Sequence, residues 1–181
     1  MDYFYTMHKK IVLTGGPSTG KTTILNLLKK NHHICIEEVS REIIIEAQKK
    51  GIKRLFLTDP LLFSETLIKK RIQQYKDAEN YVASIFIDRG IHDVLAYLQS
   101  SKTTIPLHFL ELAKQHPYDL VFIFSPWEEI YKTDNERLEN FLECKKIDLA
   151  LKETYRKYAH KIIEVPFGTA EERVNFIIKQ L

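Results

Sequence analysis

Short apolar runs alternate along the chain with longer amphipathic segments. Five of the short runs have the length and apolar composition of β-strands, namely residues 11–14, 34–37, 84–88, 120–124 and 162–165. The remaining segments have helical periodicity or helix-capping residues, at 21–30, 40–51, 59–79, 92–99, 106–115, 136–159 and 170–179. Strands that alternate with helical crossovers form parallel sheets with helices on both faces. The pattern therefore predicts an α/β fold, a three-layer αβα sandwich around a five-stranded parallel sheet.

The first predicted strand leads into a glycine-rich loop. Residues 15–22 read GGPSTGKT and fit the P-loop pattern G-x-x-x-x-G-K-[ST] at every fixed position. Glycines let successive N–H groups point at an anion, and the helix that begins at Lys21 adds its positive end. We expect Lys21 to reach the β- and γ-phosphates of ATP, or of GTP, and the Thr22 hydroxyl to bind Mg²⁺. The residues predicted to hold the nucleotide are Gly15, Gly16, Pro17, Ser18, Thr19, Gly20, Lys21, Thr22 and Thr23.

The third predicted strand ends at Asp88, and Arg89 follows it. Ligands of open parallel sheets bind beyond the carboxyl ends of the strands, so both side chains are candidates for the site. We expect Asp88 to hold Mg²⁺ directly or through water, and Arg89 to neutralise the transferring phosphate. The alternative for Asp88 is that it merely caps the next turn.

The second predicted strand ends in Glu37 and Glu38, and Arg41 lies one helical turn further on. We expect Glu38 to accept a proton from a substrate hydroxyl or to bind its sugar, although strand alternation could face either glutamate inward. Arg41 is expected to bind an anionic or planar substrate group. The alternative is an ordinary surface pair at the start of a helix, which Ser40 can cap.

Two loops after later strands are further candidates. Residues 134–137 lie where a lid would close, so Arg137 is expected to stabilise charge on the γ-phosphate, the alternative being a solvated helix start. The loop 165–168 lies near the expected nucleotide base and is either a contact for the base edge or a simple turn. Trp127 is expected to be a packing residue rather than a stacking platform.

The composition narrows the class of protein. The chain of 181 residues fits a single nucleotide-binding domain, residues 1–181, with 1–9 as a short lead-in. A net charge of +3 is too small to indicate a nucleic-acid-binding protein, and Cys35 and Cys144 lack the spacing of a zinc site. With no membrane-span run or signal-peptide core, we expect a cytoplasmic protein. The sequence does not indicate an oligomeric state.

Five segments together resemble a known family, the small single-domain "AAA domain" P-loop proteins, which are similar to the ribosylnicotinamide kinase domain of NadR. The segments are GGPSTGKTT, EEVSREI, FIDRGIHDVLAYL, VFIFSPWEEIYKTDNERLENF and IIEVPFGTAEERVNFI. The resemblance covers nearly the whole chain from Lys10 and implies a P-loop kinase fold that binds ATP and Mg²⁺. By position, Glu38 with Arg41 matches the family's acidic–basic motif, Asp88 with Arg89 its DR motif, and Arg137 its lid arginine.

These observations predict a Mg²⁺-dependent, ATP-binding P-loop protein that transfers the γ-phosphoryl group to a nucleoside-like or other hydroxylated metabolite. The predicted catalytic residues are Lys21, Glu38, Asp88, Arg89 and Arg137. The alternative is a nucleotide-regulated binding protein or ATPase switch, using ATP or GTP, that recognises a partner or a lipid headgroup. A kinase needs an acceptor pocket with a base, which Glu38 and Arg41 would supply, whereas a switch does not.

Overall fold

The computed structural model of the protein describes residues 8–52, 55–131 and 140–181. Its strands form one parallel sheet in the order β2-β3-β1-β4-β5. The strands are β1 (Lys10–Gly15), β2 (Ile34–Ile36), β3 (Ile85–Asp88), β4 (Leu120–Phe124) and β5 (Ile162–Glu164). In the centre, Val12 of β1 lies opposite Ile87 of β3 and Val121 of β4. The predicted five-stranded parallel sheet is confirmed, and the glycine-rich loop leaves its central strand.

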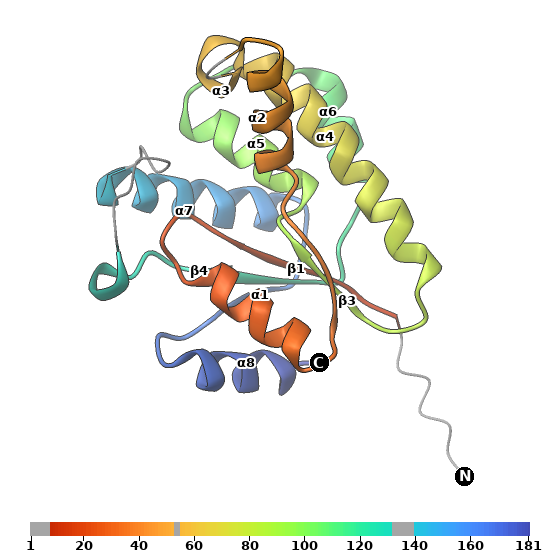
Figure 1. The fold of residues 1–181 in the computed structure, drawn as a ribbon, viewed down its shortest axis with the longest axis vertical. Coiled ribbons are helices and arrows are strands. Elements are labelled where there is room, and N and C mark those ends of the chain that lie inside the picture. The colour runs from red at the N-terminus through yellow and green to blue at the C-terminus, as the bar shows by residue number, and fades with distance from the viewer. Residues whose placement is uncertain (1–7, 53–54, 132–139) are drawn as a thin grey trace.

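Helices cover both faces of this sheet (Figure 1). They are α1 (Lys21–Lys30), α2 (Ser40–Lys49), α3 (Leu55–Thr58), α4 (Pro60–Asp77), α5 (Ile91–Ser100), α6 (Leu107–Gln115), α7 (Phe141–Lys157) and α8 (Ala170–Ile178), with short 3₁₀ turns η1 (Ala78–Asn80) and η2 (Glu128–Ile130). On one face, Leu28 of α1 and Ile177 of α8 pack in one apolar cluster with Phe122. On the other face, Leu151 of α7 packs in a second cluster with Val121. Within the described residues, no helix is both long and apolar enough to cross a membrane.

A third apolar cluster joins α2, α4 and α6 to α5. Ile43, Ile68, Leu95 and Phe109 are all buried within it. The cluster holds α4 so closely against the start of α5 that Arg71, in the middle of α4, donates a hydrogen bond to the carbonyl oxygen of Gly90 at 2.7 Å. This packing therefore brings a polar side chain from α4 to the carboxyl end of β3.

Several predicted helix ends differ from the structure. The helix predicted from residue 136 begins at Phe141, because Asn140 and Glu143 form a reciprocal capping box at its start. Ser40 is the first residue of α2 rather than its cap, and its N–H donates to the Glu38 carboxylate at 3.1 Å. The short helix α3 was not predicted. Asp59 caps α4 as predicted, accepting a hydrogen bond from the Leu62 N–H at 3.0 Å.

Two histidines meet inside the layer formed by α5 and α7. His92 is fully buried, and its Nε2 lies 3.1 Å from Nε2 of His160. When both rings are neutral, one Nε2 donates and the other accepts, whereas protonation of both rings sets two donors against each other. Burial lowers the pKa of His92 from 6.5 to about 3, with the charge of His160 acting in the same direction, and burial also lowers the pKa of His160.

We expect this pair to make the fold sensitive to acid. Because the pKa of His92 is lower in the folded protein than in the unfolded chain, the unfolded chain binds more protons below pH 6.5. The contribution of His92 to the free energy of unfolding is therefore fully present above that pH. It falls as the pH drops toward 3, by about 1.4 kcal/mol per pH unit for this one group. Urea unfolding between pH 7 and pH 5 measures the slope. His92→Gln should flatten it and exposed His108→Gln should not, so equal slopes in all three proteins would contradict this account.

Candidate active site

The loop between β1 and α1 has the backbone shape of an anion cradle. Ser18 and Gly20 have φ angles of 57° and 80°, so the chain turns twice through the left-handed region, as in backbone nests that bind anions. The Thr19 hydroxyl closes the loop by donating to the carbonyl oxygen of Gly16 at 3.1 Å. Thr22 and Thr23, in the first turn of α1, are exposed. The loop therefore fits a phosphate chain at the positive end of a helix.

Lys21 and Asp88 form an ion pair at the base of this loop. The Lys21 ammonium donates to Asp88 Oδ1, and both side chains are more than nine-tenths buried. Burial and the nearby Arg89 lower the pKa of Lys21, whereas Asp88 opposes the shift. A lysine for phosphate and a carboxylate oxygen for a hard cation are thus held side by side, and these donors fit a nucleotide with Mg²⁺.

Of the two glutamates after β2, Glu38 faces this site. Glu37 is exposed and pairs with Lys29 of α1. The Glu38 carboxylate lies 2.6 Å from Nε of Arg89 and 3.0 Å from Nη2 of Arg71. Burial alone would raise the pKa of Glu38, but the positive charges of Arg71, Arg89 and then Lys21 outweigh it and lower the pKa to about 2. Glu38 is therefore ionised at neutral pH.

Arg89 adopts a backbone conformation that is rare for a residue with a side chain. Its φ angle of 69° lies in the left-handed region, and its N–H donates to the carbonyl oxygen of Leu13 in β1 at 3.0 Å. Its side chain also donates to the Tyr97 hydroxyl at 3.1 Å. The surrounding contacts therefore hold a strained turn in place, as is common where a side chain must point into a site.

Two residues of this network were not among the predicted site residues. Arg71 is 3% exposed and bridges Glu38 to the Gly90 carbonyl, and no local pattern in α4 indicates it. Asp93 is fully buried, and its carboxylate accepts hydrogen bonds from the Thr14 and Tyr155 hydroxyls and from the Gly90 N–H. Asp93 is the last residue of the segment DRG-x-x-D, and its spacing from Gly90 is the sequence signal that could have identified it. Asp93 thus ties the end of β1 to the turn that carries Arg89.

We expect Asp93→Asn to lower the free energy of unfolding by about 3 kcal/mol, because an amide cannot accept the same set of hydrogen bonds in a buried site. Urea unfolding measures the loss. Asp77→Asn is the matched control, since Asp77 is exposed and accepts a hydrogen bond from Gln73. Equal losses of unfolding free energy in the two variants would contradict the structural role that we assign to Asp93.

The other predicted site residues are less closely tied to this cluster. Arg41 lies in the first turn of α2 with an exposed side chain, and its role in binding an acceptor stays a prediction. Arg137 and the lid predicted at 134–137 lie outside the described residues. Trp127, expected to pack, stacks on Phe167 of the loop after β5, with ring centroids 5.1 Å apart and planes at 20°.

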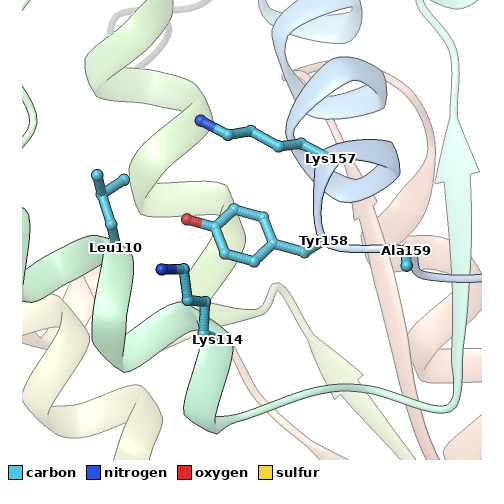
Figure 2. A pocket seen from close by; sticks show the side chains of 5 residues that line it. All are labelled: Leu110, Lys114, Lys157, Tyr158 and Ala159. Carbon is cyan, nitrogen blue, oxygen red and sulfur yellow. The ribbon is translucent and has the colours of Figure 1, made fainter.

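Two cavities differ in their position relative to the P-loop. One of about 550 Å³ is lined by Pro126, Trp127, Glu128, Glu129, Phe141, Lys145 and Phe167, on segments that follow β4 and β5. Its wall on α7 is close to the loop, since a Cβ on Gly16 would lie 3.6 Å from the Cys144 carbonyl oxygen. The other, of about 460 Å³, lies between α6 and the end of α7, where Lys114, Lys157 and Tyr158 surround it (Figure 2). Those helix ends lead into the amino ends of β4 and β5, so the second cavity lies away from the phosphate loop.

The central strand, its glycine-rich loop and the buried lysine–aspartate pair define a P-loop domain. Residues 10–173 match the family model described as "AAA domain", and the chain belongs to this family. A curated relative from Pseudomonas fluorescens (strain SBW25), named "Nucleotide-binding protein", is 22% identical over 107 residues. That match covers 59% of this chain but only 37% of the relative. The predicted family resemblance is confirmed.

Solved structures share the fold at low sequence identity. A deoxyadenosine kinase from M. mycoides, with products bound, superposes with a TM-score of 0.68 at 16% identity, covering 94% of this chain and 97% of its own. A thymidylate kinase from Ehrlichia chaffeensis gives 0.64 at 15% identity, covering 96% and 98%. The NadR protein in complex with NR gives 0.65 at 16% identity, with 96% of this chain but 50% of NadR covered. These matches establish the P-loop kinase fold.

Proposed function

We propose that the protein is a Mg²⁺-dependent kinase that transfers the γ-phosphoryl group of ATP to a hydroxyl of a nucleoside-like or other hydroxylated metabolite. The observation that carries the proposal is the Glu38 carboxylate held between Arg71 and Arg89 beside the P-loop. A nucleotide-binding loop needs no such cluster to hold phosphates, whereas a kinase needs groups that orient an acceptor toward the γ-phosphate. The kinase names of the proteins with the same fold agree with this assignment.

The donor side of the site is assigned to the P-loop. Gly15–Thr23 would surround the phosphates with backbone N–H groups, and Lys21 would leave Asp88 to pair with the β- and γ-phosphates. Thr22 and Asp88 would hold Mg²⁺, which supplies charge neutralisation for the phosphate oxygens when bound. We place the nucleotide base in the 550 Å³ cavity beside Trp127 and the loop 165–168, because this cavity adjoins the phosphate loop.

The acceptor side is assigned to Glu38 and its two arginines. With a pKa of about 2, Glu38 is a weak base but a permanently ionised hydrogen-bond acceptor. The loose transition state of phosphoryl transfer needs orientation of the attacking hydroxyl more than strong deprotonation. Glu38 would therefore hold and align the hydroxyl and take its proton late, while Arg89 neutralises the transferring group. Arg41 is assigned to an anionic or planar part of the acceptor, and Arg137 to the γ-phosphate.

A screen for acceptors tests the proposal. Purified protein with MgATP, and separately with MgGTP, is incubated with single nucleosides and small alcohols, and ADP or GDP release is recorded. At least one hydroxylated compound should raise nucleotide turnover well above the rate without acceptor, and omission of Mg²⁺ should abolish the increase. If nucleotide binds but no compound stimulates turnover, the alternative of a nucleotide-regulated switch for a partner or lipid headgroup replaces the kinase.

A further inference from the structure

A buried arginine from the last helix contacts the P-loop. Arg173 of α8 is 3% exposed, and its Nη1 donates to the carbonyl oxygen of Thr19 at 3.0 Å. Its guanidinium lies over the Phe124 ring, 4.8 Å from the centroid, and 5.9 Å from that of Trp127. Nε and Nη2 are buried without a hydrogen-bond partner in the part of the chain that the structure describes. Arg173 therefore contacts one P-loop carbonyl and two aromatic rings.

The charge of Arg173 has no anion to offset it among the described residues. Arg71 is also buried and the Arg89 side chain is 16% exposed, but both face Glu38. Burial alone lowers the pKa of Arg173, with no contribution from an acidic neighbour. A buried cation without a counter-charge destabilises the fold, and an apolar side chain in the same space is often tolerated better. The contact with the P-loop indicates that this charge has a role other than packing.

The geometry of the peptide group shows what this contact controls. The carbonyl of Thr19 and the N–H of Gly20 belong to one planar trans peptide and point in opposite directions. Arg173 is buried in the fold and holds the carbonyl oxygen on its own side of the loop, so the N–H points to the opposite side, where we place the phosphates. Gly20 has a φ of 80°, and a Cβ there would lie 2.8 Å from Nη1 of Arg173. Glycine leaves room for the guanidinium at this peptide.

We propose that Arg173 is a positioning residue of the nucleotide site, which fixes the Thr19–Gly20 peptide with its N–H directed at the bound phosphate. This role rests on the proposed nucleotide binding. The charge of Arg173 also attracts the phosphates across the loop, and the phosphates supply the missing counter-charge. A flipped peptide would instead present a carbonyl oxygen to the anion and weaken binding.

Calorimetry of MgATP and MgGTP binding tests the effect on affinity. R173M removes the donor and the charge, and should weaken the tighter-binding nucleotide about tenfold to a hundredfold, the size of one charge-assisted hydrogen bond. Its thermal unfolding midpoint without nucleotide should not fall. R173K, which keeps charge and a donor, should recover part of the affinity, and K179M on the exposed end of α8 should bind like the wild type.

Nuclear magnetic resonance tests the peptide orientation directly. Gly15 and Gly20 are the only glycines that follow a threonine, so labelling threonine carbonyls and glycine nitrogens leaves two amide signals. Addition of ADP should shift the Gly20 signal strongly in the wild type and much less in R173M at saturating nucleotide.

Equal affinity and equal shifts in both proteins overturn the role of Arg173 while the proposed function stands. An R173M protein that fails to fold shows a structural role and also overturns it. A wild type that binds neither nucleotide overturns the proposed function, and this role with it.

Discussion

Glu38→Gln is expected to lower acceptor-dependent ADP formation by about a hundredfold to ten-thousandfold while nucleotide still binds. The neutral amide keeps the shape of the side chain but cannot take the proton of the acceptor hydroxyl. It also no longer balances the charges of Arg71 and Arg89, so the hydroxyl loses its alignment. Steady-state turnover with the acceptor found by screening measures the loss, and calorimetry measures nucleotide binding.

Glu37→Gln is the matched control for this experiment. Glu37 is the adjacent carboxylate, but it is exposed and pairs with Lys29, so its loss should change turnover little. Because Glu38→Gln removes the anion that Arg71 and Arg89 share, circular dichroism must show that the variant is folded under the assay conditions. Turnover that survives in Glu38→Gln, or that is lost in Glu37→Gln instead, would contradict the assignment of the acceptor site.

Lys21→Met should weaken nucleotide binding by about a hundredfold, because Lys21 is the cation in the loop that we assign to the phosphates. The variant should also lose about 3 kcal/mol of stability, since Asp88 stays buried and charged without its partner. Calorimetry and urea unfolding measure the two effects separately.

The double variant Lys21→Met/Asp88→Asn separates binding from folding. Removing the orphaned charge of Asp88 should restore most of the stability, whereas nucleotide affinity should stay low. If the double variant regains affinity along with stability, then the single variant failed to bind only because it was unfolded. In that case Lys21 would not be the phosphate ligand.

The strand pattern and the P-loop could be predicted because both are local signals. The loop places its fixed residue types within eight positions, and each strand is a short apolar run. Arg71 and Arg173 could not be predicted, because their partners are distant in sequence. Arg71 reaches Glu38 across 33 residues, and Arg173 reaches Thr19 across 154. Each lies in a helix whose pattern of hydrophobic and polar residues does not mark the arginine as a site residue.

Local signals also explain the errors in the predicted helix ends. The charged pattern around 136–159 continues without a break, so it does not mark where the helix starts. The capping pair Asn140 and Glu143 is visible in the sequence and decides the start at Phe141. The choice between Glu37 and Glu38 needed the fold, because it depends on Lys29 lying on one side and Arg89 on the other.

Phosphorus NMR of the reaction mixture tests the central claim most directly, because it shows where the γ-phosphoryl group goes. The protein is mixed with MgATP and the acceptor identified by the screen, and the phosphorus signals are followed with time. We expect the γ-phosphate signal of ATP to be replaced by a phosphate-ester signal that couples to the carbon-bound protons of the acceptor. Inorganic phosphate as the sole product, in equal amount with and without acceptor, would contradict it.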